Sequence, residues 1–317
     1  MVATTEVEAF VMRQHCAAIF LLLSASLAPS LLQARTVALV VSGLGGNPEY
    51  SEAFKEYGTA IADGLSSLEI DDDAIIYLDE TADRDSLLAA FETQARAPAD
   101  VFVLVLLGHG TSDATTWRFN IKGPDLTTED LVSALNLVQA PEQLLVLATS
   151  SSGALLDVLS QPGRVVITAT KSGGELNAVR FPEYLATAIG TEQADLDRNE
   201  ILTAAEAFRF ADNRTREYYE TQNLLAPEHA RLRGEGAESI ALAKLGALRE
   251  AQDDPAVLAL LEQRLGLEQR FTAIKQQKSS LSTNDYYAAL ESVLLELARL
   301  QRSIDDATGW SETDGNS

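Results

Sequence analysis

The sequence predicts an α/β fold in which a mainly parallel β-sheet is flanked by helices and followed by a C-terminal helical hairpin. Three observations support this prediction. Short apolar runs rich in Val, Leu and Ile are typical of strands that are buried on both faces. They alternate with segments in which apolar residues recur every three or four positions, as in amphipathic helices. After about Gly234 the strand signal fades and good helix formers dominate.

Five strands are expected in the sheet domain, which we place at residues 35–234. They cover residues 36–42, 74–78, 101–107, 144–149 and 164–168. Helices are expected at residues 50–68, 85–93, 153–159, 181–189 and 202–219, and a further helix begins after a cap at Thr127. Because strands and helices alternate, we expect right-handed crossovers and a mainly parallel sheet.

Residues 235–306 are expected to form the helical hairpin. Leucines recur at helical spacing in two stretches, and residues 279–284 interrupt the pattern. Ser282 or Thr283 is the predicted cap of the second helix. The hairpin packs either on the sheet domain or on a second copy of the chain, so an oligomer formed through these helices remains an open alternative. Residues 307–317 are predicted to be a disordered tail.

Residues 1–34 have the pattern of a secretory signal peptide. A basic Arg13 precedes an apolar stretch at residues 17–27, and the small residue Ala34 offers a cleavage point. The alternative is an uncleaved anchor, which the short run and Pro29 disfavour. We therefore expect an exported protein, periplasmic or secreted, with no transmembrane span in its mature chain. Cleavage would also remove Cys16, the single cysteine.

The composition excludes several classes of function. The formal net charge is −23, and a surface this acidic repels phosphate backbones, so nucleic acid is not an expected partner. The glycine-rich turn at residues 43–46 matches neither the dinucleotide fingerprint nor the P-loop. No grouping of His, Cys and carboxylates predicts zinc. The apolar fraction of 46% is sufficient for a large core.

Two of the predicted strands end in small-residue turns that carry polar chemistry. One turn holds His109 and Gly110, and the other is Ser150-Ser151-Ser152-Gly153. The carboxyl ends of parallel strands meet at one edge of a sheet, where ligands and catalytic groups collect. His109 is the leading candidate for a general base, and the N–H of Gly110 can bind an oxyanion. The alternative is structural: a histidine hydrogen-bonded at a strand end, and serines that cap the next helix.

Together the two turns resemble the caspase-like fold of clan CD cysteine peptidases. The chain looks most similar to the legumain-like asparaginyl endopeptidases and their exported bacterial relatives. Further similar segments occur at residues 119–131, 165–172, 194–208 and 225–230. The resemblance implies that His109 takes the place of the catalytic histidine, Gly110 that of the oxyanion donor and Ser150 that of the cysteine. A caspase-style alignment would move the nucleophile to Ser151.

The serine is a departure from the family pattern. A thiol is partly ionised near neutral pH, whereas a hydroxyl needs a well-oriented base, and the sequence identifies no third group to orient His109. We therefore expect a peptidase homologue with impaired catalysis that binds a peptide or protein. One alternative is an active serine-type hydrolase, an endopeptidase or transpeptidase, that uses Ser150 with His109. Another is an assembly protein that acts through its C-terminal helices.

A second motif predicts a calcium loop. Asp195, Asp197, Asn199 and Glu206 fall at positions 1, 3, 5 and 12 of the calcium-binding spacing. Glu200 stands at position 6, where the turn favours glycine, and this counts against the motif. The alternative is an acidic, capped helix start. Calcium is the one candidate cofactor.

Overall fold

The computed structural model of the chain describes residues 35–308, apart from residues 69, 114–115, 251–253, 277 and 279–280. The predicted signal segment with Cys16 and residues 309–317 of the predicted tail lie outside the described residues. Among the described helices, none combines the length and apolar character that a bilayer crossing requires.

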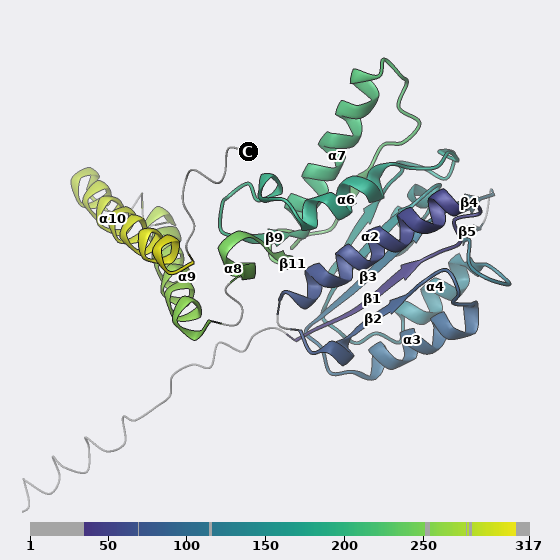
Figure 1. Ribbon diagram of the computed structural model, residues 1–317, viewed down its shortest axis with the longest axis horizontal. Coiled ribbons are helices and arrows are strands. Elements are labelled where there is room, and N and C mark those ends of the chain that lie inside the picture. Colours follow the sequence, from purple (N-terminus) through teal and green to yellow (C-terminus); the bar gives the residue numbers. More distant parts are fainter. Residues whose placement is uncertain are drawn as a thin grey trace, which may run out of the picture. The chain divides into compact units, whose positions relative to one another are not determined.

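Six strands form the main sheet, in the order β10-β8-β7-β3-β1-β2 (Figure 1). Neighbouring strands run parallel except β10, which pairs with β8 in the antiparallel sense. The predicted α/β fold with a mainly parallel sheet is therefore confirmed. The strands are β1 (Thr36–Ser42), β2 (Ile75–Leu78), β3 (Val101–Gly108), β7 (Glu142–Thr149), β8 (Arg164–Thr168) and β10 (Arg231–Arg233).

Helices cover both faces of the sheet, which explains the continuous apolar runs in the central strands (Figure 1). One face packs on α2 (Pro48–Ser66), α6 (Phe181–Ile189) and α7 (Ala204–Thr221). The other face packs on α3 (Arg84–Arg96), α4 (Thr128–Leu135) and α5 (Leu156–Leu159). Successive residues of β3 alternate between the two cores, Val103 and Val105 toward α2 and Leu104 toward α3.

Side-chain caps begin helices α2 and α4. Asn47 caps α2 by accepting a hydrogen bond from the Tyr50 amide, and Pro48 occupies the first turn. Thr127 caps α4 in a reciprocal capping box with Asp130, which confirms the predicted cap.

Several short strands were not predicted. β4 (Gly110–Ser112), β5 (Trp117–Phe119) and β6 (Leu126–Thr127) form a three-stranded antiparallel meander directly after His109. Short 3₁₀ turns lie at η1 (Asp72–Ala74), η2 (Ser152–Leu155) and η3 (Glu192–Ala194). Strands and turns this short carry too few residues for a period of apolar positions to be visible.

The C-terminal part differs from the predicted hairpin at its beginning. Residues within the range 235–306 form strand β11 (Ala241–Lys244), which pairs with β9 (Ile201–Thr203). Leu242 and Ala243 are buried in the core beside α2. The helices that follow are α8 (Gly246–Glu250), α9 (Pro255–Gln276) and α10 (Thr283–Thr308).

Helices α9 and α10 pack against each other, as the hairpin prediction requires. The Ser282 hydroxyl accepts a hydrogen bond from the Asp285 amide at 3.2 Å, which confirms the predicted cap at this position. Helix α10 runs past residue 307, where the tail was predicted to begin.

Candidate functional site

The two polar turns lie side by side, as predicted. Strands β3 and β7 are neighbours, and their pairing ends with Gly108 opposite Thr149. His109 and Ser150 follow directly on the two strands. A Cβ atom added to Gly110 would lie 2.5 Å from the Ser150 carbonyl oxygen, so only glycine allows the two turns to approach this closely.

The ring of His109 is half-buried against α2. It makes edge contacts with Tyr50 and Phe54, with centroid distances of 4.8 and 5.2 Å. Its Nε2 atom lies 3.2 Å from the carbonyl oxygen of Gly45. A carbonyl only accepts hydrogen bonds, so Nε2 carries the proton and Nδ1 is the basic atom of the neutral ring.

Burial sets the charge of this histidine. It lowers the pKa of His109 below the usual histidine value, although the hydrogen bond to Gly45 favours the charged ring. The imidazole is therefore neutral at neutral pH. A neutral imidazole with a lowered pKa accepts a proton less readily than an ordinary histidine.

The group that orients His109 is a main-chain carbonyl, which no side-chain pattern predicts. Gly45 lies in the turn between β1 and α2, and a Cβ atom there would lie 2.2 Å from the Ser51 amide nitrogen. Glycine therefore allows the turn to close on the start of α2 and brings its carbonyl to the histidine.

The N–H of Gly110 is directed away from the meander. The Asn120 amide donates to the His109 carbonyl and the Asp113 amide donates to the Thr116 carbonyl, both at 3.1 Å. Hydrogen-bonded and non-hydrogen-bonded pairs alternate along an antiparallel ladder, so the pair of Gly110 with Phe119 is a non-hydrogen-bonded one. The amide is thus available to a ligand at the edge of the sheet, as an oxyanion donor must be.

The three serines of the second turn are all buried, but their hydroxyls differ. Ser152 Oγ accepts hydrogen bonds from the amides of Ala169 and Thr170, at 3.1 and 3.3 Å, and so ties the turn to the end of β8. Ser151 Oγ lies 3.5 Å from the Glu175 carbonyl. Among the described residues, the hydroxyl of Ser150 has no hydrogen-bond partner.

Alternation along β7 places Ser150 on the same side as His109. Val146 and Ala148 pack in the core beneath α2, and Ser150 is the next residue in that series. Within the described part of the chain, however, no hydrogen bond joins His109 to any of the three serines. Ser150 and Ser151 were the two candidates for the nucleophile position. Ser150 has its hydroxyl on the same face of the sheet as His109, whereas the hydroxyl of Ser151 is turned toward Glu175.

A second histidine lies near this turn and was not predicted as part of the site. His229 Nδ1 is 2.5 Å from Glu175 Oε1, and the Lys171 ammonium is 3.4 Å from the same oxygen. Burial acts to raise the pKa of Glu175, but the bonds from the Lys171 amide and from His229 hold it below its usual value. The Glu175 carbonyl binds the Ser151 amide at 2.9 Å, so this cluster holds the loop after β8 against the serine turn.

The predicted calcium residues lie together. Asp195, Asp197 and Glu206 each place an oxygen within 4.8 Å of the others. Asn199 is adjacent: its amide nitrogen Nδ2 donates to Asp197 at 3.1 Å, while its side-chain oxygen accepts from the Ile201 amide at 2.7 Å. Burial, followed by the charges of Glu206 and Asp195, raises the pKa of Asp197.

The capped helix start, which was the alternative interpretation of this motif, is also present. Thr203 and Glu206 form the capping box of α7. The three crowded carboxylates offer the oxygen ligands that a hard cation prefers, so the residues fit calcium. Calcium binding remains a prediction.

The residue at position 6 of this loop has a structural role. Glu200 has a left-handed backbone with φ of 63°, which favours glycine. Its carboxylate accepts from the Leu248 amide at 2.8 Å and pairs with Arg264 of α9 at 3.2 Å. Arg264 also donates to the Asn199 carbonyl at 2.7 Å. The loop is therefore the point at which α8 and α9 attach.

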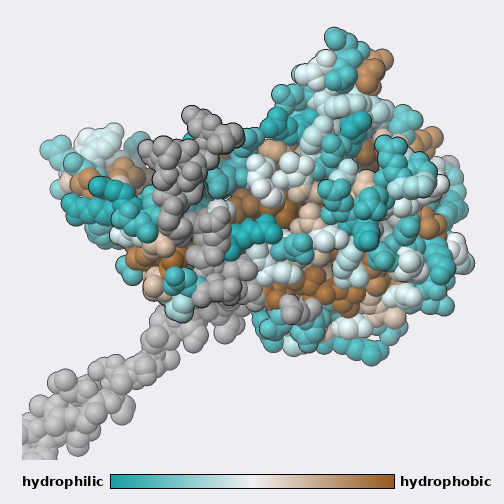
Figure 2. All heavy atoms as spheres, viewed as in Figure 1, coloured by the Kyte–Doolittle hydropathy of each residue, from teal (hydrophilic) through white to brown (hydrophobic). Residues whose placement is uncertain are grey.

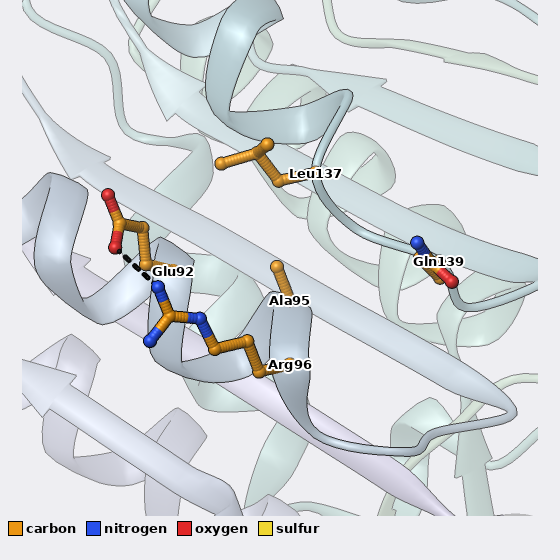
Figure 3. Close-up of a pocket in the computed structure, with 5 residues that line it drawn as sticks. All are labelled: Glu92, Ala95, Arg96, Leu137 and Gln139. Atoms are coloured by element: carbon orange, nitrogen blue, oxygen red, sulfur yellow. Dashed lines mark hydrogen bonds and ion pairs between the residues drawn. The ribbon is translucent and has the colours of Figure 1, made fainter.

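Surface pockets also occur away from the two turns. One, of 500 Å³, lies between α3 and the segment after α4, at the amino ends of β3 and β7 and so on the edge of the sheet opposite His109 (Figure 3). Its only ion pair joins Arg96 to Glu92 in the view of Figure 3. The visible surface is mainly hydrophilic, with apolar patches interspersed (Figure 2).

No protein-family model matches the chain, and no curated protein matches it. The solved structures that are similar include two caspases. The initiator caspase Dronc of Drosophila has 12% sequence identity and a TM-score of 0.42, with 66% of this chain and 81% of that chain covered. Caspase-1 from Spodoptera frugiperda has 10% identity and a TM-score of 0.44, with 67% and 90% covered.

Proposed function

We propose that this chain is a caspase-like peptidase homologue, related to the legumain-like family, that binds a peptide or protein segment at the two turns without cleaving it. The observation that carries the proposal is that His109, held by the Gly45 carbonyl, lies beside a turn that offers a hydroxyl at position 150 where a thiol is needed. The free N–H of Gly110 is suited to hold a backbone carbonyl of the bound segment.

The electrostatics of His109 argue against activation of Ser150. A serine hydroxyl is far less acidic than a thiol, so it depends on a base that becomes stable as imidazolium. His109 is oriented by a neutral carbonyl and not by a carboxylate, and burial disfavours its charged form. Burial makes the imidazolium costly, and the neutral carbonyl offsets that cost less than a carboxylate would.

A fluorophosphonate electrophile, which labels activated serines, tests this proposal. We expect no labelling of the folded protein and no turnover of peptides that carry Asn or Asp at the point of cleavage. Labelling of Ser150 that His109→Ala abolishes would instead establish the alternative, a serine-type hydrolase. Ser150→Cys is the informative companion, because peptide cleavage by that variant alone would show that only the thiol is missing.

We also propose that the protein is exported after removal of residues 1–34. The signal pattern of that segment supports this proposal. N-terminal sequencing of the protein from cells that express it, together with cell fractionation, provides the test. A chain that still carries residues 1–34 and stays with the membranes would favour the anchor.

The third alternative, assembly through the C-terminal helices, has one supporting feature. Helix α10 carries Tyr287, Leu294 and Leu295 at the surface, each at least half exposed. A chain truncated after Glu250 keeps β11 and tests this role. If the full chain is an oligomer by light scattering and the truncated chain is a folded monomer, the helices mediate assembly.

A further inference from the structure

The peptide unit between Ser150 and Ser151 is held at both ends. Its carbonyl oxygen accepts hydrogen bonds from Trp117 Nε1 at 3.4 Å and from Thr149 Oγ1 at 3.1 Å. Its N–H, that of Ser151, donates to the Glu175 carbonyl at 2.9 Å. The orientation of this peptide plane is thus set by three groups, of which Trp117 and Glu175 lie far from it in the sequence.

This plane also contains a strained residue. Ser151 has φ of 58°, in the left-handed region that residues with a side chain rarely adopt. Such a conformation persists only when the surroundings over-determine it. Rotation of the plane changes ψ of Ser150 together with φ of Ser151, so the same three bonds also fix how the Ser150 hydroxyl is presented.

Trp117 is well placed to impose this orientation because its ring is itself fixed. The side chain is 1% exposed and stacks on Phe119 with a centroid distance of 6.2 Å and an interplanar angle of 5°. Its amide donates to Thr128 Oγ1 at 2.9 Å, at the start of α4. A rigid donor therefore reaches the serine turn from the meander.

Gly110 leaves the space that this contact needs. A Cβ atom there would lie 2.9 Å from Trp117 Nε1 and 2.5 Å from the Ser150 carbonyl oxygen. The same glycine that offers a free N–H to a ligand thus also lets the indole reach the serine turn.

We propose that Trp117 is a positioning residue for Ser150, whose indole N–H holds the Ser150–Ser151 peptide so that the side chain at position 150 faces the His109 side of the turn. The inference rests on the proposed function only in treating position 150 as the centre of the binding site. The positioning by Trp117 requires neither peptide cleavage nor a bound ligand.

The test uses a thiol at position 150 as a reporter. In a Ser150→Cys, Cys16→Ser chain, the rate of alkylation by iodoacetamide is measured from pH 6 to pH 9. Trp117→Phe keeps an aromatic ring and removes the N–H donor. We expect it to change the alkylation rate at a fixed pH by about three- to tenfold, as loss of one hydrogen bond implies, and to displace the pH profile.

A matched control separates positioning from general stability. Phe91 is a fully buried aromatic residue in the core around α3, and its replacement in Phe91→Leu loosens the core without touching the turn. This control should leave the pH profile of the thiol unchanged. An unchanged rate and profile in Trp117→Phe would overturn the proposal.

If Trp117→Phe fails to fold, benzothienylalanine at position 117 keeps the bicyclic shape and lacks the N–H, and the same outcomes apply. Labelling of wild-type Ser150 by the fluorophosphonate would refute the non-cleaving function but not the positioning role. The two proposals therefore fail by different measurements.

Discussion

Ser152→Ala should destabilise the protein, whereas Ser150→Ala should not, although the two serines are two residues apart and both are buried. Ser152 Oγ accepts from the amides of Ala169 and Thr170. In Ser152→Ala the Ala169 amide keeps a second acceptor, the Leu147 carbonyl at 3.1 Å. The substitution therefore leaves one buried donor without its acceptor, the amide of Thr170. The cost of an unmade buried hydrogen bond predicts a loss of about 1–3 kcal/mol in the free energy of unfolding.

Ser150 has no such bond among the described residues, so Ser150→Ala should stay within about 0.5 kcal/mol of the parent. Urea unfolding followed by circular dichroism measures both values. Equal losses in the two variants, or a larger loss in Ser150→Ala, would refute the assignment of Ser152 to structure and of Ser150 to the binding face.

Three further predictions concern other residues. Thr215→Val should raise the free energy of unfolding by about 1 kcal/mol, because the Thr215 hydroxyl is buried without a partner among the described residues; a loss measured by urea unfolding would contradict this. The pKa of His109 is lowered on folding, so its contribution to stability is complete above the unfolded value of about 6.5 and is lost as pH falls toward the folded pKa. His109→Gln should therefore flatten the decline of thermal stability in that acid range, and an unchanged decline would show that other groups cause it. Calcium should raise the midpoint of thermal unfolding more than magnesium does, and Asp195→Asn should remove this response; equal midpoints in calcium and in chelator would eliminate the site.

The parallel sheet was predictable because strands buried on both faces leave continuous apolar runs, as in β3 and β7. The juxtaposition of His109 with the serine turn followed from that sheet, since adjacent parallel strands end at one edge. Strand β11 was missed because its four residues are also good helix formers or small, so nothing local distinguishes them from a helix.

The supporting groups of the site were beyond prediction for a different reason. Glu175 and His229 are 54 residues apart in the chain, and Trp117 is 33 residues from Ser150. Neither pair has a spacing that a motif could reveal. Contacts of this kind depend on how loops return to the sheet, which composition and periodicity do not determine.

The main-chain partner of His109 has a consequence for how this site can change through mutation. A carboxylate that orients a histidine is lost when that one residue is replaced, whereas a main-chain carbonyl is not a side-chain group, although any side chain at position 45 itself would displace the turn. The orientation is lost only if the turn moves, and the close approach to Ser51 ties any such movement to the start of α2. The histidine can therefore keep its geometry through many substitutions around it, including the loss of a reactive partner at position 150. A well-formed histidine is accordingly poor evidence that a lineage still performs the chemistry for which that geometry is suited.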